Sequence, residues 1–279
     1  MNRRILDETM LQGFAAHLKF EEKSPITIEK YLRDAGRFAD FAGGGEVTRE
    51  LVIDYKQNLI AQGYAVASVN SMLASLSSLF RYLGWSDCQV RSLRRQRQVY
   101  CAPEKELTRE EYLRLLQASE GRPQLNLLLQ TICGTGIRIS ELKYFTVEAV
   151  NQGEVVIQCK HKTRIVLLPG KLRKLLLRYA KNRRIGSGSI FVTRSGSPLN
   201  RSNVWSQMKK LCEKAEVAAS KVFPHNLRKL FARTYYNMVQ DIAKLADMLG
   251  HSSIDTTRIY IMTIGREHRR QIEKLGLVV

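Results

Sequence analysis

Residues 221–260 have the sequence KVFPHNLRKLFARTYYNMVQDIAKLADMLGHSSIDTTRIY, and the rest of the chain is organised around them. Pro224 suits the first position of a helix, so a helix is expected to begin there. His225 and Arg228 are three residues apart and therefore share one face of that helix. The stretch carries four side chains of the kinds that act on phosphate esters: His225, Arg228, His251 and Tyr260.

The second half of this stretch predicts a helix end followed by a short helical segment. Gly250 is typical of a helix stop, which leaves His251 in a turn just beyond it. Polar side chains then follow that can cap the segment carrying Tyr260: Ser252, Ser253 and Asp255. His225 and Arg228 are thus expected at a helix start, His251 just beyond a helix end, and Tyr260 on the short capped segment that follows.

HNLR (225–228), LGHSS (249–253) and a tyrosine nine residues after the second histidine resemble the tyrosine recombinase (phage integrase) family. The resemblance implies that Tyr260 is the nucleophile and that His225 accepts its proton. It also implies that Arg228 and His251 bind the scissile phosphate. Short motifs arise by chance when taken singly, but an ordered set of them indicates the family strongly.

A second arginine motif lies upstream, in GTGIRISEL (134–142). Arg138 stands between two apolar residues, Ile137 and Ile139, and therefore needs an acceptor from the protein or from a ligand. Taken alone, the motif favours a structural ion pair with Glu141, three residues on. It also matches the family's first arginine motif, which implies that Arg138 grips the phosphate and that Glu141 supports the site.

Residues 153–169 predict a β-hairpin, with strands at 155–157 and 165–167 and a polar turn over 160–163. By itself the turn is an ordinary basic turn. In the family, a lysine of this hairpin is the general acid that protonates the leaving oxygen. Lys160 matches the first lysine of the family's pattern and is the preferred candidate, with Lys162 as the alternative.

The charge of the chain is unevenly distributed. Of the net charge of +19, residues 1–106 contribute +2 and residues 107–279 contribute +17. So large a positive excess favours a polyanion, and nucleic acid is the usual one, although an acidic protein or a membrane surface is an alternative. No apolar run approaches the roughly 20 residues of a membrane span, and the N-terminus lacks a signal-peptide core. A cytoplasmic protein, associated with the bacterial nucleoid when bound to DNA, is therefore expected.

The five cysteines are scattered and form no CxxC pair, so neither a zinc site nor a disulfide framework is expected. Reduced structural thiols are the favoured interpretation. The resemblance likewise implies no cofactor and no metal, because positively charged side chains act on the phosphate.

The predicted fold is mainly α with a small β-sheet. Helical apolar spacing over 1–88 predicts an N-terminal bundle, in which Ser24 or Thr27 begins the second helix and Ser68 the fourth. Residues 89–106 are expected to be a charged linker, and 107–279 a mixed α/β catalytic domain with a C-terminal tail. The resemblance implies that the bundle is a SAM-like core-binding domain that clamps DNA.

Candidate DNA contacts lie in two places. The basic run 91–97 is either a solvated charge run or a phosphate-binding segment, and there we select Arg94 and Arg95. After a short strand expected at 189–192, an amphipathic helix capped by Asn200 or Ser202 is predicted. In the family such a helix often lies in the major groove, which points to Arg201, Asn203 and Lys210.

The resemblance implies a site-specific recombinase of double-stranded DNA that forms a 3′-phosphotyrosyl intermediate. It also implies a homotetramer in the synaptic complex, a monomer or dimer when free, and a tail (266–279) that docks on a neighbouring protomer. Integration, excision, inversion, transposition of a mobile genetic element and dimer resolution all fit. Two alternatives stay open, a type IB topoisomerase and a DNA-binding accessory protein without catalysis.

Overall fold

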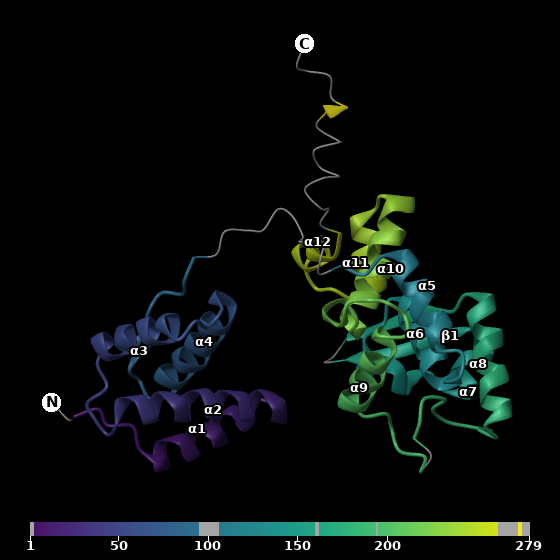
Figure 1. Cartoon of the computed structure of the whole chain (residues 1–279). Helices are drawn as coiled ribbons and strands as arrows, with labels where there is room; N and C mark the ends of the chain where they lie inside the picture. The colour runs from purple at the N-terminus through teal and green to yellow at the C-terminus, as the bar shows by residue number, and fades with distance from the viewer. Residues whose placement is uncertain (1–2, 95–105, 160–161, 194, 262–272, 275–279) are drawn as a thin grey trace. The chain divides into compact units, whose positions relative to one another are not determined.

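The computed structural model describes residues 3–94, 106–159, 162–193, 195–261 and 273–274. The chain divides into two compact units, residues 1–97 and 98–279, and the division falls within the expected linker range of 89–106 (Figure 1). The described residues are mainly helical, with one two-stranded sheet, which confirms the predicted fold class. Among them, no helix combines the length and the apolarity needed to cross a membrane.

The N-terminal unit is a helical bundle around an aromatic and aliphatic core. Phe14, Phe38 and Phe80 are almost completely buried in it. Phe38 meets Phe80 edge to face, with ring centroids 5.7 Å apart, a favoured aromatic geometry. The unit consists of α1 (Glu8–Phe20), α2 (Pro25–Ala42), α3 (Arg49–Ala61), α4 (Val66–Tyr82) and the 3-10 helix η1 (Ser86–Cys88).

The starts of α2 and α4 can be compared with the predicted helix starts: one decides between two candidates and the other corrects a prediction. Ser24 is the N-cap of α2, and its side chain accepts a hydrogen bond from the Thr27 amide. The prediction that Ser68 begins the fourth helix is wrong, because α4 begins at Val66 without a side-chain cap. The Ser68 amide instead donates to the Ala65 carbonyl. Packing of the apolar face of α4 stabilises this first turn in place of a cap.

The C-terminal unit begins with the predicted capping box: the side chains of Thr108 and Glu111 each accept a backbone amide of the other residue. Asn200, not Ser202, caps the later amphipathic helix. The elements are α5 (Arg109–Ala118), α6 (Pro123–Thr135), η3 (Ile139–Tyr144), α7 (Val147–Gln152), β1 (Glu154–Cys159), β2 (Lys162–Leu167), α8 (Gly170–Asn182), α9 (Arg201–Cys212), η4 (Ala219–Lys221), α10 (Pro224–Val239), α11 (Ile242–Leu249) and α12 (Ile254–Ile261).

The β-hairpin is present, but its strands are longer than predicted. β1 and β2 pair antiparallel from Glu154↔Leu167 to Cys159↔Lys162, so two residues connect them rather than four. The strand expected at 189–192 is wrong. Among the described residues, that segment makes isolated bridges, at Ser189 to Thr146 and at Val192 to Pro198, and does not pair with a continuous strand.

One close approach fixes how the two arginine motifs meet. Gly136 ends α6 with a left-handed φ of +65°, and a Cβ there would overlap the ring of Phe231 on α10. Glycine is therefore required both by the backbone conformation and by the neighbouring helix. The contact brings the turn that follows α6, with Arg138, against the helix that carries Arg228.

Candidate active site

Tyr260 lies beside His225 at the meeting of α12 and α10. The Tyr260 hydroxyl is 3.3 Å from His225 Nδ1, and the two rings lie edge to face with centroids 4.9 Å apart. Tyr260 is only 6% exposed. The short helix that presents it begins with a hydrogen bond from the Asp255 amide to Ser253 Oγ. An imidazole nitrogen in contact with a phenol is the arrangement needed for proton transfer.

His225 is held in its neutral form. Partial burial of the ring lowers its pKa, and the positive charges of Lys229 and Arg228 lower it further. A neutral imidazole has one nitrogen with a free lone pair. His225 can therefore accept the proton of Tyr260 at neutral pH.

Arg228 is the most deeply buried charged group of the site, with 1% exposure. Its Nη1 donates to the Gly136 carbonyl at 2.5 Å and its Nη2 to the Leu249 carbonyl at 2.7 Å. Its guanidinium carbon is 5.8 Å from the centre of the Tyr260 ring. Burial, then the charge of Arg138, lowers the pKa of Arg228 to about 10. The group therefore stays charged at neutral pH, next to the tyrosine.

The contacts of His251 identify its tautomer. Its Nε2 lies 3.0 Å from Arg228 Nη2, and its Nδ1 lies 2.9 Å from Thr257 Oγ1. A guanidinium can only donate, so Nε2 accepts and the ring proton is on Nδ1, facing Thr257. Burial and the nearby arginines, Arg228 first, lower the pKa of His251 to about 4. His251 is therefore neutral, and its ring centroid is 4.9 Å from that of Tyr260.

Arg138 and Glu141 form the ion pair that the GTGIRISEL motif favours when it is taken alone. Arg138 Nη1 lies 3.0 Å from Glu141 Oε1, and the Arg138 amide donates to Oε2 at 2.7 Å. The Arg138 side chain is nonetheless 41% exposed, against 2% for Arg228. Arg138 is thus the arginine of this site that is open to an incoming anion.

Sequence reasoning missed Arg164, on β2. Its Nη2 lies 2.7 Å from Glu141 Oε2, and its Nη1 donates to the Leu249 carbonyl. With Arg228 Nη1 at 4.0 Å, Glu141 faces three arginines from three elements. The alternation of side chains along a strand could have identified it, because Arg164 lies on the same, inward face of β2 as buried Val166.

The predicted sites in the linker and the hairpin turn lie largely outside the described residues. Lys160 and Arg95 are outside them, as is the side chain of Lys162. Arg94 is described and exposed. The tail (266–279), which is predicted to dock on a neighbouring protomer, also lies mostly outside the described residues.

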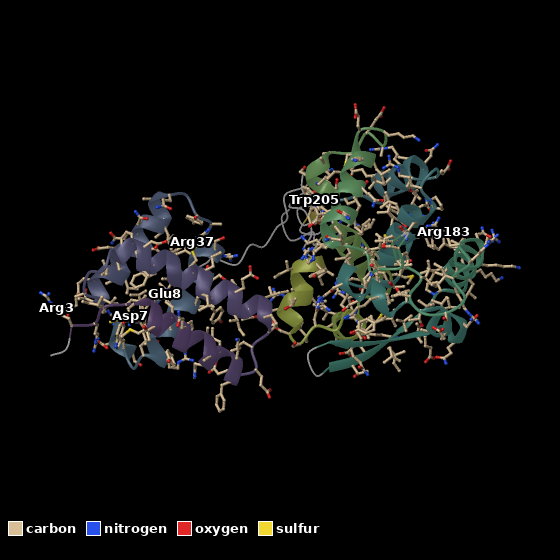
Figure 2. All side chains as sticks on the ribbon, turned by 90° about the horizontal axis from the view of Figure 1, so that it is seen from below. Arg3, Asp7, Glu8, Arg37, Arg183 and Trp205 are labelled. Carbon is tan, nitrogen blue, oxygen red and sulfur yellow. The ribbon has the colours of Figure 1, made fainter. Side chains whose placement is uncertain are left out.

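The three candidate contacts on α9, Arg201, Asn203 and Lys210, are all exposed. The charge of Arg201 is among those that lower the pKa of His225, so the first turn of α9 lies near the site. Sequence reasoning missed Trp205 (labelled in Figure 2), which is 50% exposed one turn further along. Lys209 Nζ lies 5.0 Å from the centre of its ring. An exposed tryptophan among cations suits contact with DNA bases and phosphates.

The chain matches two families along most of its length. Residues 105–264 match the phage integrase family, and residues 11–87 match the phage integrase N-terminal SAM-like domain.

Curated relatives agree with these family matches, and a solved structure agrees with the fold. The tyrosine recombinase XerA of Thermococcus kodakarensis is 30% identical, over 96% of both chains. The XerA of Pyrococcus furiosus is 28% identical over 100% of this chain and 98% of its own length. A lambda integrase tetramer bound to a Holliday junction is similar in fold, with a TM-score of 0.74 at 18% identity, covering 93% of this chain and 78% of that one.

Proposed function

The chain belongs to the phage integrase family and is a tyrosine-type site-specific DNA recombinase, and on that premise we propose which residues cut and rejoin the DNA. The Tyr260 hydroxyl attacks the scissile phosphorus while His225 accepts its proton. The observation that carries this assignment is the 3.3 Å contact between the Tyr260 hydroxyl and His225 Nδ1 beside buried Arg228. With His225 placed to accept its proton, the Tyr260 hydroxyl can act as the nucleophile, and the positive groups around it favour the anionic transition state.

Positive side chains stabilise the transition state. A phosphodiester repels nucleophiles because it is negatively charged, and further charge builds up on its non-bridging oxygens during attack. Arg138, which is partly exposed, and the buried Arg228 offset that charge with their guanidinium groups. His251 joins them when the bound phosphate raises its pKa, so that Nε2 gains a proton and donates.

The leaving group departs as a 5′-hydroxyl. Lys160 gives a proton to the 5′-oxygen as the bond from phosphorus to that oxygen breaks, with Lys162 as the alternative donor. The products are a 3′-phosphotyrosyl link on Tyr260 and a free 5′-hydroxyl end. Attack by another 5′-hydroxyl reverses the step, so the energy of the original bond is conserved and no ATP is needed.

Double-stranded DNA is the substrate. Three features support DNA as the substrate: the net charge of +17 on residues 107–279, the exposed face of α9 and the exposed Arg94. Arg201, Asn203 and Lys210 contact DNA near the cleaved phosphate, and Arg94 and Arg95 contact the backbone at the linker. The bundle of α1 to α4 is the core-binding domain.

Strand exchange takes place in a homotetramer that assembles on two DNA sites. The tetramer of the similar lambda integrase structure supports this state, with the tail (266–279) linking protomers. The reaction serves integration, excision or resolution, as on a mobile genetic element, and takes place in the cytoplasm, where the DNA is. The names of the relatives, tyrosine recombinases, favour this role over a topoisomerase or a non-catalytic accessory protein.

The test is to trap and map the covalent adduct. A random-sequence pool of nicked duplexes is incubated with the protein, and DNA that stays attached under denaturing conditions is recovered. We expect peptide mapping to find DNA on Tyr260 through a 3′-phosphate. Tyr260→Phe should bind DNA but form no adduct, whereas Tyr236→Phe, a half-buried tyrosine of α10, should form it normally. An adduct that survives in Tyr260→Phe would overturn the assignment.

A further inference from the structure

Arg164 joins three segments that are far apart in the sequence. One end of its guanidinium meets Glu141 of η3 at 2.7 Å, and the other donates to the carbonyl of Leu249 at the end of α11. The side chain itself comes from β2 and is only 13% exposed. A planar fork that binds two acceptors at once fixes their distance from each other, which a lysine cannot do.

The turn that Arg164 holds is the one that presents His251. Leu249 accepts from both Arg164 and Arg228, and His251 follows two residues later. Gly250, between them, has φ +64°, and a Cβ there would overlap the Arg164 side chain. The backbone of this turn is thus packed directly on Arg164, so that a shift of the arginine would move the turn.

We propose that Arg164 is a positioning residue of the recombination reaction: it holds the 249–251 turn against Glu141 so that His251 stays within reach of Arg228 and the phosphate. This inference rests on the role proposed above for His251. Arg164 itself need not touch DNA, because Glu141 and the Leu249 carbonyl already engage its fork. Its contribution is therefore to the geometry of the transition state rather than to DNA binding.

The experiment compares Arg164→Gln and Arg164→Lys with a matched control, Arg173→Gln. Arg173, on α8, also donates to backbone carbonyls, those of Val150 and Asn151, but it is not part of the site. Each full-length variant is assayed on a nicked duplex selected for cleavage by the wild-type protein. The readouts are DNA affinity, the single-turnover cleavage rate and the midpoint of thermal unfolding.

Arg164→Gln should slow cleavage about 100-fold, the effect expected of a displacement of about 1 Å in a catalytic group, with DNA affinity within about threefold of wild type. Arg164→Lys keeps the charge but not the double contact and should recover part of the rate. Arg173→Gln should cleave at close to the wild-type rate. Cleavage by Arg164→Gln within threefold of wild type would overturn the proposal.

A double mutant separates positioning from general structural support. If Arg164 acts through His251, then in a His251→Gln background the further change Arg164→Gln should slow cleavage less than about threefold. Losses that multiply would overturn the proposal. If Arg164→Gln does not unfold cooperatively, Arg164→Lys alone decides, and a wild-type rate in that variant would overturn the proposal. The wild-type adduct on Tyr260, measured in parallel, reports separately on the proposed function.

Discussion

Each of the two units buries a carboxylate within a helical framework, and the two carboxylates differ in the number and the burial of the cations around them. Asp34, in the N-terminal unit, is 1% exposed and meets Lys30 at 2.8 Å and Ser75 Oγ at 2.9 Å. Glu141, in the C-terminal unit, is 3% exposed and faces Arg138, Arg164 and Arg228. The first cluster has one close ion pair, with the partly exposed Lys30, a longer one at 3.9 Å with the exposed Arg33, and a hydrogen bond from Ser75. The second has an excess of positive charge at its centre.

That difference separates a structural cluster from the cluster for which we propose a function. A buried charge that is paired avoids the penalty of an uncompensated one and needs no ligand for this. Unbalanced charge destabilises the folded protein until an anion arrives, and sites of this kind are where function is found. Burial is the first cause of the lowered pKa values of His225, Arg228 and His251, and the neighbouring cations lower them further.

Neutralising each carboxylate should give the largest contrast. Glu141→Gln leaves three arginines without a counter-charge, so we expect the free energy of unfolding to fall by about 3–5 kcal/mol and cleavage to become undetectable. Asp34→Asn should lower it by only about 1–3 kcal/mol, because Lys30 can reach water. Urea unfolding and adduct formation measure both effects. Cleavage by Glu141→Gln at the wild-type rate would erase the distinction between the two clusters.

Arg228→Lys should have the next largest effect. The lysine keeps one positive charge but cannot hold Gly136, Leu249 and His251 together, so cleavage should slow by about 10²–10³ with little loss of DNA affinity. Arg233→Lys is the matched control on the same helix. Arg233 pairs with Glu106 and the Leu107 carbonyl, outside the site. Equal rate losses in the two variants would mean that the packing of α10, and not phosphate chemistry, explains why lysine cannot replace Arg228.

The pH dependence of stability sharpens the comparison further. His251 takes up a proton near pH 6.5 when unfolded but not until about pH 4 when folded. The unfolded state therefore binds more protons between these values, and the free energy of unfolding should fall as the pH drops from 6.5 towards 4. In His251→Gln this decrease should be smaller. Unfolding of both proteins in urea at pH 7 and pH 5.5 tests it, and identical slopes would contradict a neutral, half-buried His251.

The smallest effect is expected at Trp205. Trp205→Ala should weaken DNA binding by about 1 kcal/mol, or roughly fivefold, and leave the cleavage rate at saturating DNA unchanged. The chain has two tryptophans, so Trp85→Phe makes Trp205 the only one. Its fluorescence should change when DNA binds. No change at saturating DNA would place α9 away from the duplex.

The helices and the order of the motifs could be predicted from the sequence because they depend on local rules. Thr108 and Glu111 form their capping box through neighbouring residues, and His225 and Arg228 share one turn of α10. The errors arose where packing outweighs local preference. α4 begins before its expected cap, and the segment at 189–192 lacks a partner strand.

By itself, the sequence determined the family and the helix-rich fold, and it predicted which groups act on phosphate. Those properties follow from residue type and short spacing. Only the tertiary structure decided that Glu141 joins three arginines, that Arg164 belongs to the site, and that His251 accepts from Arg228. The physical reason is separation along the chain: Glu141 and Arg164 are 23 residues apart, and Gly136 and Arg228 are 92 apart. Contacts over such distances exist only once the packing of α6, α10 and the hairpin has brought these segments together.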